Sequence, residues 1–369
     1  MKAEPQPIEI PDSVLVPLRE RLGAARMPPM FEGDEGWGLG CERSALDRVC
    51  GHWIEEHDWH LTEDRLNEMK PVAWQGVHSF ALGLESGGIP VVMLHGWPST
   101  PLEYLPAAEL LVEAGHPCVV PSLPGFAFSD DPGEPLDVAR ASSMIRELVE
   151  TGLGIDRYAV AGGDWGAVIA ARMAWDSGGT VAGLYVSTPA TLPAPGGLED
   201  PPPTAAEMEF AQAAQTWLRQ MGHHMVIQSR APDAISPALQ DSPAGFAAYL
   251  LEKYRRWSDC QGDLFSRFSE EVLCDWLTAQ WGPGSVASSM RLYWGERRNR
   301  WRLGAGEGID VPAAVSVWGG EPLIPPRSWT ERVLPQMGAW TEMDSGGHFA
   351  AFEEPEAYSS DLSAFLTTL

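Results

Sequence analysis

One stretch of the sequence, residues 158–173, constrains the fold more than any other; it reads YAVAGGDWGAVIAARM. Four apolar residues are followed by a glycine-rich bend and then by a second apolar run, which is the pattern of a buried strand that turns sharply into a helix. A side chain at the centre of such a bend is held out from the chain in a strained, exposed position. Its neighbours must be small because the helix packs close beneath it, and Gly162 and Gly166 meet that requirement.

The residue at the centre of this bend is Asp164. The arrangement resembles the nucleophile elbow of α/β-hydrolases, whose usual pattern G-x-S-x-G has serine at this place. A carboxylate that attacks an electrophilic sp3 carbon forms an alkyl ester with the enzyme, and a second step must hydrolyse that ester. The sequence therefore favours a substrate with a leaving group or a strained ring, although the pattern G-x-D-x-G alone also describes an ordinary turn.

The rest of the chain alternates between patterns of strand and helix. A helix is expected at 138–153, and apolar runs predict strands at 77–84, 89–94, 118–120, 181–187 and 313–318. This alternation predicts a mostly parallel central sheet with helices on both faces, which is the α/β-hydrolase fold. Residues 189–203 are rich in Pro and Gly, and Thr204 begins a capping-box pattern that opens a helix. Strand patterns are then missing until about 308, so we expect a helical cap inserted after the sixth strand.

Four regions follow from this pattern. Residues 1–76 form an N-terminal extension, with helices expected at 11–26 and from about Ser44. Residues 77–190 form the first part of the α/β core and residues 191–308 form the cap. Residues 309–369 complete the core and end with a helix expected at about 355–365.

Charge and cysteine content bear on partners and location. The formal net charge of −26 disfavours nucleic acid and anionic membranes as partners, because both would repel such a surface. The five cysteines are scattered without C-x-x-C spacing, which favours free thiols in a reducing compartment. The first residues lack the apolar run of a signal peptide, so we expect a cytoplasmic protein. We predict no metal site, because the spacing of His52, His57 and His60 differs from the i, i+4 pair of a zinc helix.

Two candidate partners of Asp164 follow later strands. In α/β-hydrolases the nucleophile, the acid and the histidine occur in this order, each on a loop after a strand at the same edge of the sheet. Glu321 follows the predicted strand 313–318, and His348 follows a short strand predicted near 340–343. Asp164, Glu321 and His348 could therefore converge, with Asp344 as the competing acid.

A further motif, HGWP at 95–98, follows the predicted strand 89–94. Gly96 allows a turn that directs the next backbone N–H groups into the site, where they can stabilise an oxyanion. The backbone N–H groups of Trp97 and Trp165 are our candidates for this oxyanion hole. We also expect the side chains of His95, Trp97 and Trp165 to contact the substrate.

Three segments together resemble the signatures of the microsomal-type epoxide hydrolases, namely HGWP at 95–98, GGDWG at 162–166 and GGHFAAFEEPE at 346–356. The likeness extends over nearly the whole chain, because LRERL at 18–22 and Trp59 before Leu66-Asn67 are similar to the N-terminal region peculiar to that family. Eukaryotic members begin with a membrane anchor. We expect this chain to correspond to soluble microbial members, which have none.

The resemblance implies Asp164 as the nucleophile, His348 as the base that activates water and Glu321 as its acid partner, with no cofactor. Family members hydrolyse epoxides to vicinal diols and have two cap tyrosines that donate to the epoxide oxygen. Segment 288–293 matches one of them and gives Tyr293, which also contacts the substrate; segment 223–228 matches the other but has His224 in its place. Either His224 donates, or Tyr293 acts as the one donor, or the register is shifted and another side chain fills the role.

Two alternative functions stay open. A haloalkane dehalogenase shares the Asp nucleophile and the Trp165 position, where a tryptophan holds the halide. Dehalogenases commonly have a halide-holding Asn where Trp97 stands here, or a second Trp in the cap, so Trp97 together with the cap Tyr293 favours an epoxide. A catalytically silent α/β-hydrolase fold that binds a ligand is the alternative outside enzymes, and the complete set of triad residues argues against it.

The substrate is predicted only as a class. Aromatic residues of the cap region could line a pocket for an apolar or aromatic epoxide, namely Trp217, Trp257, Trp276, Trp281 and Trp294. Arginine greatly outnumbers lysine, and Ala, Gly and Pro are abundant, which indicates a bacterial genome of high GC content. A role in natural product biosynthesis or in detoxification is consistent with this composition, and a homodimer is one assembly that we consider.

Overall fold

The computed structural model describes residues 2–30, 36–196 and 201–369. Within them, the strands form one nine-stranded sheet with the order β1-β2-β3-β5-β4-β6-β7-β8-β9. The strands are β1 (Glu4–Pro5), β2 (Val72–Trp74), β3 (Val77–Leu82), β4 (Val91–Leu94), β5 (Cys118–Pro121), β6 (Tyr158–Gly162), β7 (Val181–Val186), β8 (Ala313–Trp318) and β9 (Met337–Met343). Pairing is parallel from β5 through β9 and antiparallel among β1, β2, β3 and β5.

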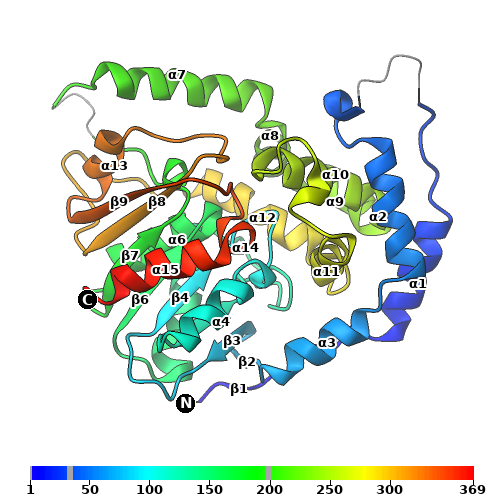
Figure 1. Ribbon diagram of the computed structural model, residues 1–369, viewed down its shortest axis with the longest axis horizontal. Coiled ribbons are helices and arrows are strands. Elements are labelled where there is room, and N and C mark those ends of the chain that lie inside the picture. The colour runs from blue at the N-terminus through cyan, green and yellow to red at the C-terminus, as the bar shows by residue number, and fades with distance from the viewer. Residues whose placement is uncertain (1, 31–35, 197–200) are drawn as a thin grey trace.

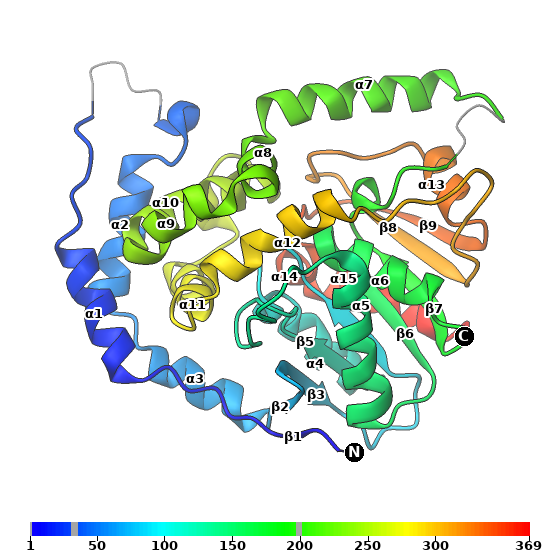
Figure 2. The same ribbon diagram turned by 180° about the vertical axis from the view of Figure 1, so that it is seen from behind.

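Helices cover both faces of this sheet. One face carries α4 (Leu105–Glu113) and α15 (Pro355–Leu366), and the opposite face carries α5 (Val138–Arg146) and α6 (Asp164–Trp175), as Figures 1 and 2 show from the two sides. Every residue of β4 through β8 is buried, which explains why these strands are continuous apolar runs rather than alternating ones. The predicted mostly parallel sheet with helices on both faces is therefore confirmed.

Some elements differ in detail from the sequence patterns. The helix expected at 138–153 is α5 followed by a wider π-helical segment, η3 (Glu147–Leu153). Short helical segments occur also at η1 (Gly36–Leu39), η2 (Pro101–Glu103) and η4 (Pro189–Thr191), and two short helices lie near the end of the core, α13 (Arg327–Val333) and α14 (Ala350–Glu353).

The cap follows β7 and is helical, as predicted. Its helices are α7 (Ala205–Gln220), α8 (His223–Arg230), α9 (Ser236–Asp241), α10 (Pro243–Trp257), α11 (Glu270–Trp281) and α12 (Val286–Arg298), with short 3-10 turns at η5 (Pro232–Ala234) and η6 (Leu264–Ser266). The predicted capping box is present, because the Thr204 hydroxyl accepts the Glu207 N–H at 3.2 Å and the Glu207 carboxylate accepts the Thr204 N–H at 2.8 Å. Part of the Pro-rich stretch expected at 189–203, residues 197–200, lies outside the described residues.

In chain order β7 is the seventh strand, whereas we expected the cap after the sixth. The apolar runs predict five strands before the cap, and the structure adds the short edge strands β1 and β2, which pair with each other and bring the number to seven. Without β1, the cap follows the sixth strand of the sheet.

The N-terminal region joins the sheet edge to the cap. It contains α1 (Asp12–Gly23), α2 (Arg43–Glu55) and α3 (Trp59–Glu68), and α1 and α2 pack along α10 and α11 on the outer side of the cap (Figure 1). The buried Trp53 indole donates to the Thr278 hydroxyl at 2.9 Å across this contact. The N-terminal region therefore helps to hold the cap in position relative to the core.

Two further predictions can be compared with the structure. The five cysteines, all of which lie in the described parts of the chain, are free thiols, as expected. In those same parts, none of the helices combines the length and the apolarity that crossing a bilayer requires.

Candidate active site

Asp164 lies at the bend between β6 and α6, as predicted. Its φ of +50° is the left-handed conformation that side-chain-bearing residues rarely adopt, and its N–H donates to the Thr188 hydroxyl at 2.5 Å. A Cβ on Gly162 would lie 2.5 Å from the carbonyl carbon of Gly166, and one on Gly166 would lie 1.8 Å from the Leu94 oxygen. The two glycines are therefore needed for the strand and helix to approach closely enough to hold this strained bend.

The structure brings His348 and Glu321 to Asp164. The His348 Nε2 lies 3.8 Å from the Asp164 Oδ2, and the His348 Nδ1 lies 2.8 Å from the Glu321 Oε2. Glu321 follows β8 and His348 follows β9, so all three side chains stand at the carboxyl edge of the parallel strands. Asp344, the competing acid, is exposed, and Glu321 is the carboxylate that contacts the imidazole.

Charges around His348 shift its pKa strongly. Burial lowers the pKa of His348, but the hydrogen bond and charge of Glu321 and the charge of Asp164 outweigh burial and raise this pKa to about 9. Burial raises the pKa of Asp164, which the imidazole and two backbone N–H groups partly counteract. At neutral pH the imidazole of the resting site is therefore mostly protonated, with Glu321 on one side and Asp164 on the other.

The two predicted oxyanion-hole donors both reach the nucleophile. The Trp97 N–H donates to the Asp164 Oδ1 at 2.8 Å, and the Trp165 N–H is also hydrogen-bonded to this carboxylate. A Cβ on Gly96 would lie 2.3 Å from the Asp164 Oδ1, so only glycine leaves room for the carboxylate there. Oδ1 is thus held by the backbone, and Oδ2 is the oxygen that faces His348.

His95, which we expected to contact the substrate, serves a different purpose. Its Nδ1 bonds the Gly96 carbonyl at 3.0 Å, its Nε2 accepts the Leu123 N–H at 3.1 Å, and the side chain is fully buried. Burial lowers the pKa of His95 to about 4, so the ring is neutral, as an acceptor for Leu123 must be. The structure does not place His95 against the cavity beside Asp164; this ring braces the HGWP turn.

Tyr293 lies on α12, close to Asp164 and Trp165. Its ring meets the Trp165 ring edge-on at 4.8 Å. Burial and the nearby Asp164 carboxylate raise the pKa of Tyr293 well above its usual value, so it is a neutral phenol and can donate a proton.

His224 also reaches the site, from α8. Its ring stacks on Trp97 with centroids 5.2 Å apart and the planes 10° from parallel, and it meets Tyr293 edge-on at 6.0 Å. Burial lowers the pKa of His224 well below its usual value, so the ring is uncharged. His224, which aligns with the second cap tyrosine of the family, therefore lies beside Tyr293.

Sequence reasoning missed Tyr249, a residue of α10. Its ring packs on Trp97 with centroids 5.8 Å apart, and the Gln228 amide donates to its hydroxyl at 3.3 Å. Tyr249 also lies near Tyr293. The sequence around it, AAYLLEKY, offers no sign of this position, because it reads as an ordinary amphipathic helix.

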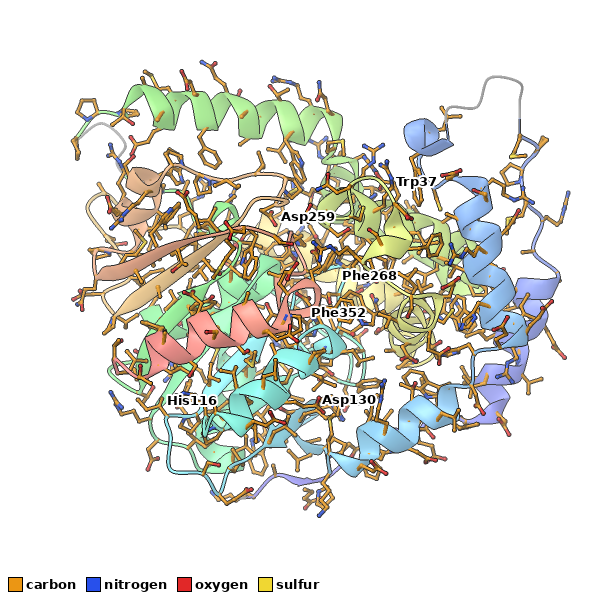
Figure 3. All side chains as sticks on the ribbon, viewed as in Figure 1. Trp37, His116, Asp130, Asp259, Phe268 and Phe352 are labelled. Carbon is orange, nitrogen blue, oxygen red and sulfur yellow. The ribbon has the colours of Figure 1, made fainter. Side chains whose placement is uncertain are left out.

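The loop that carries His348 is anchored to the cap. The His348 N–H donates to the Trp257 carbonyl at 2.8 Å, and a Cβ on Gly347 would lie 2.7 Å from that same oxygen. Nearby, Phe268 of the cap stacks on Phe352 of the core at 5.4 Å, and Figure 3 labels both residues where the two parts meet. The position of the imidazole thus depends on the cap as well as on β9.

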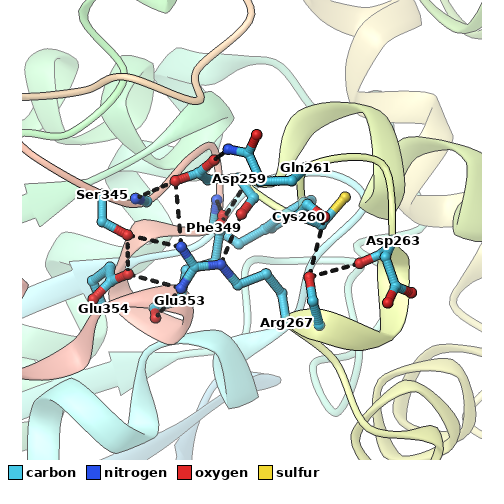
Figure 4. A network of polar contacts seen from close by, with 11 residues as sticks. Asp259, Cys260, Gln261, Asp263, Arg267, Ser345, Phe349, Glu353 and Glu354 are labelled. Carbon is cyan, nitrogen blue, oxygen red and sulfur yellow. Dashed lines mark hydrogen bonds and ion pairs between the residues drawn. The ribbon is translucent and has the colours of Figure 1, made fainter.

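A polar network reinforces this junction (Figure 4). The Arg267 guanidinium bonds the Glu354 carboxylate at 2.7 Å and the Ser345 hydroxyl at 2.8 Å on the core side. It also bonds the Asp259 carbonyl at 2.8 Å on the cap side, while the Glu353 carboxylate accepts the Asp259 N–H at 2.7 Å. We call these five residues the clamp.

Two cavities bear on the site. A small one beside the nucleophile is lined by Asp164, His348, Glu103 and Ser99 together with Gly96, Trp97, Gly163 and Phe349. A larger cavity of about 510 Å³ lies elsewhere, between residues 131–136, residues 230–234 and one side of α12, and Trp294 is among its lining residues. None of the candidate catalytic residues lines the larger cavity, so we place the chemistry at the small one.

One of the three histidines considered for a metal lies in an acidic group. The ligand atoms of His57, Glu271 and Asp275 lie within 4.8 Å of one another. Asp275 already binds the His57 ring at 3.1 Å and the Arg65 guanidinium at 3.4 Å. Both carboxylate oxygens of Asp275 thus have protein partners, which is the pattern of an ion-pair cluster between α3 and α11.

Comparisons with known proteins agree with this geometry. A family model described as "Epoxide hydrolase N terminus" matches residues 3–104, and one described as "alpha/beta hydrolase fold" matches residues 89–355. A protein of Stigmatella aurantiaca named "Putative epoxide hydrolase" is 32% identical, with 97% of this chain and 83% of that protein covered. Epoxide hydrolase 1 of Sus scrofa is 28% identical, with 99% of this chain and 88% of that protein covered.

Solved structures show the same likeness. The crystal structure of juvenile hormone epoxide hydrolase from the silkworm Bombyx mori matches with a TM-score of 0.85 at 27% identity, covering 99% of this chain and 93% of that chain. The structure of Aspergillus niger epoxide hydrolase matches with a TM-score of 0.85 at 24% identity, covering 100% of this chain and 97% of that chain, and shows the shared fold.

Proposed function

This chain belongs to the epoxide hydrolase family of the α/β-hydrolase fold, and on that basis we propose that it opens an oxirane to a vicinal diol through an ester on Asp164. The observation that carries the proposal is the contact chain from the Asp164 Oδ2 through the His348 imidazole to Glu321. A carboxylate nucleophile, a base and an acid that orients the base are the groups that a two-step hydrolysis requires.

In the first step the Asp164 Oδ2 attacks one oxirane carbon, and the C–O bond of the ring breaks. The Trp97 N–H holds Oδ1 at 2.8 Å, which leaves Oδ2 free to attack. The departing oxygen takes the proton of the Tyr293 hydroxyl, which the raised pKa of that phenol keeps available at neutral pH. Such a general acid contributes about 10²–10⁴-fold to the rate.

In the second step water hydrolyses the ester. Alkylation removes the negative charge of Asp164, one of the charges that raise the pKa of His348, so the imidazolium loses its proton more readily. That proton replaces the one that Tyr293 gave in the first step, and the neutral imidazole becomes a base. Water then gives a proton to Nε2 and bonds to the Asp164 Cγ, and the charge on Oδ1 is stabilised by the N–H groups of Trp97 and Trp165. Collapse releases the diol and leaves one water oxygen in the carboxylate.

Two cap residues are candidates for the second hydrogen-bond donor to the epoxide oxygen. We propose that His224 or Tyr249 assists Tyr293, since both rings contact Trp97 beside it. Comparing His224→Phe with Tyr249→Phe separates them, because each change removes one polar group and keeps a ring. The variant that slows alkylation more identifies the second donor.

The rival functions make different predictions. A dehalogenase holds halide with the tryptophan at the Trp165 position and commonly with an Asn where Trp97 stands, whereas here Trp97 beside the cap residue Tyr293 favours an epoxide. Formation of diol from an epoxide, together with no release of halide from chloroalkanes, would support an epoxide hydrolase. A silent ligand-binding protein would return a bound epoxide intact after prolonged incubation.

A single turnover in ¹⁸O-water tests the covalent route. Excess enzyme is mixed with styrene oxide, and the peptide containing Asp164 is then analysed by mass spectrometry. The expected result is label in that peptide, with a control lacking epoxide unlabelled. Label found solely in the diol would overturn the covalent route.

The substrate is proposed to be apolar or aromatic. Of the five cap tryptophans, Trp257 meets the His348 ring at 5.1 Å and Trp217 meets the His224 ring at 6.3 Å, so these two stand at the site. Trp276 packs in the core against Phe349 at 5.8 Å, and Trp294 lines the larger cavity. A panel of aliphatic, styrene-like and bulky aromatic epoxides tests this class through kcat/KM.

The sequence also supports proposals for the cellular location, the oligomeric state and the biological role of the protein. We propose a cytoplasmic bacterial enzyme, as a homodimer or a monomer, that serves natural product biosynthesis or detoxification. Its formal net charge of −26 supports the absence of nucleic acid and membrane partners. Size-exclusion chromatography with light scattering measures the assembly, and cell fractionation measures the location.

A further inference from the structure

A second carboxyl group faces the proposed site and has no part in the two steps above. Glu103 ends η2, the short helical turn that follows the HGWP motif, and only 4% of it is exposed. The turn is fixed at its start, because the Thr100 hydroxyl accepts the Leu102 N–H at 3.3 Å. Glu103 is thus built into the wall of the site on the same segment that supplies the Trp97 N–H.

The cavity that Glu103 lines also touches both reacting groups. Glu103, Ser99, Asp164 and His348 are the lining residues with polar side chains. The space open to the centre of a water molecule is about 10 Å³. A buried water needs roughly 10–15 Å³ of such space and two to four polar partners, so the cavity is a site for one water.

The groups around Glu103 explain how a carboxyl can be buried there. The Glu103 carboxyl lies near His348, Asp164 and Glu353, and Ser99, Tyr104, Tyr254 and Tyr358 are also among its neighbours. Burial raises the pKa of Glu103 to about 8, so at neutral pH it is mostly an uncharged acid. In that form it can both accept and donate a hydrogen bond without adding charge beside the nucleophile.

We propose that Glu103 is a positioning residue that holds the water for hydrolysis of the Asp164 ester, at the point between the His348 Nε2 and the Asp164 Cγ. The inference rests on the proposed function, because without an ester this water has nothing to attack. The water gives one proton to the His348 Nε2 and forms its new bond to the Asp164 Cγ. Glu103 hydrogen-bonds the water and neither gains nor loses a proton. The bond between the Asp164 Cγ and Oδ2 then breaks, and Oδ2, which leaves as a hydroxyl oxygen of the diol, takes the proton from Nε2.

The proposal predicts a change confined to the second step. Glu103→Ala leaves the water free to move, and a displacement of about 1 Å costs on the order of 10²-fold in rate. Glu103→Gln keeps a carbonyl oxygen and a donor in the same place and should restore hydrolysis to within several-fold of wild type. Alkylation of Asp164 uses neither the water nor Glu103, so its rate should stay within a few-fold in both variants.

A matched control is available near the other end of β6, the strand that precedes Asp164. The Glu150 carboxylate accepts the hydroxyl hydrogen of Tyr158, the first residue of β6, whereas Asp164 lies just beyond the last residue of that strand. Glu150→Gln therefore changes a comparable carboxyl group far from the cavity. Both steps should proceed as in wild type.

Rapid-mixing single turnovers with styrene oxide, quenched in acid and analysed by intact mass, measure ester formation and ester decay separately. The expected result is a long-lived ester in Glu103→Ala, rescued decay in Glu103→Gln and unchanged kinetics in Glu150→Gln. Unchanged decay in Glu103→Ala, or an equal slowing of formation and decay, overturns the role of Glu103 while leaving the ester of the wild type in place. An enzyme that forms diol with no ester at any time, and no ¹⁸O in the Asp164 peptide, overturns the proposed function itself.

Discussion

Replacing Glu321 by glutamine removes one charge from the site and keeps the shape of the side chain. In wild type the Glu321 carboxylate lies 2.8 Å from the His348 Nδ1, and both side chains are less than 10% exposed. The amide oxygen of Glu321→Gln can still accept a hydrogen bond from Nδ1. What is lost is the negative charge that stabilises the imidazolium while water attacks the ester.

The size of the loss follows from the burial of the pair. Breaking a buried ion pair costs about 3–5 kcal/mol. Because each 1.36 kcal/mol is a factor of ten in rate, we expect ester hydrolysis to slow by about 10²–10⁴-fold. Alkylation needs no base, so it should change by less than about tenfold.

The pH dependence changes in a defined direction. Glu321 raises the pKa of His348, and hydrolysis requires the imidazole without its proton. Removing the charge lowers this pKa, so the acid limb of the hydrolysis profile moves to lower pH while its plateau falls. A shift of this limb to higher pH would contradict the reasoning.

Stopped-flow tryptophan fluorescence follows both steps, because Trp97 and Trp165 contact the nucleophile through their N–H groups. The control is Asp344→Asn, since Asp344 is an exposed carboxylate on the same loop as His348 and should leave both steps unchanged. Less than tenfold slowing of hydrolysis in Glu321→Gln with an unmoved acid limb would refute the role assigned to this carboxylate.

Three further predictions use other contacts of the site. Gly96→Ala places a Cβ 2.3 Å from the Asp164 Oδ1 and must disturb the bond from the Trp97 N–H, so kcat/KM should fall by about 10²–10³-fold, with circular dichroism showing an intact fold. Tyr293→Phe should slow alkylation by about 10²–10⁴-fold and leave ester decay nearly unchanged, and equal slowing of both steps would argue against a proton donor. Arg267→Met removes the centre of the clamp and should lower the thermal midpoint by several degrees and slow ester hydrolysis, whereas Arg327→Met, which breaks an exposed pair with Glu331, should do neither.

The residues that sequence patterns placed well share one property. Asp164, Glu321 and His348 each follow a buried strand directly, and parallel strands end at one edge of the sheet, so local pattern and topology together fix their neighbourhood. The same holds for the N–H of Trp97 after β4. The strain at Asp164 could also be expected, because glycines flank it at the spacing that a sharp bend needs.

The residues that were missed depend on contacts across the fold. Tyr249 lies in the middle of α10 and reaches the site only because that helix crosses above Trp97. Glu103 is a lone acid in a short turn, and its burial is evident only once His348, some 250 residues later in the chain, closes the cavity. His95 was placed against the substrate, yet the Leu123 backbone of a distant loop binds its ring instead. The local sequence gives no sign of such contacts between residues far apart in the chain.

The most direct measurement of the central claim is the intact mass of His348→Gln after incubation with excess styrene oxide, followed by peptide mapping. Without the imidazole 3.8 Å from the Asp164 Oδ2, the ester should form and persist, and the mass of one epoxide should appear on the peptide that contains Asp164. An unmodified variant that still produces diol, or an adduct on any other side chain, would contradict a carboxylate nucleophile at this bend.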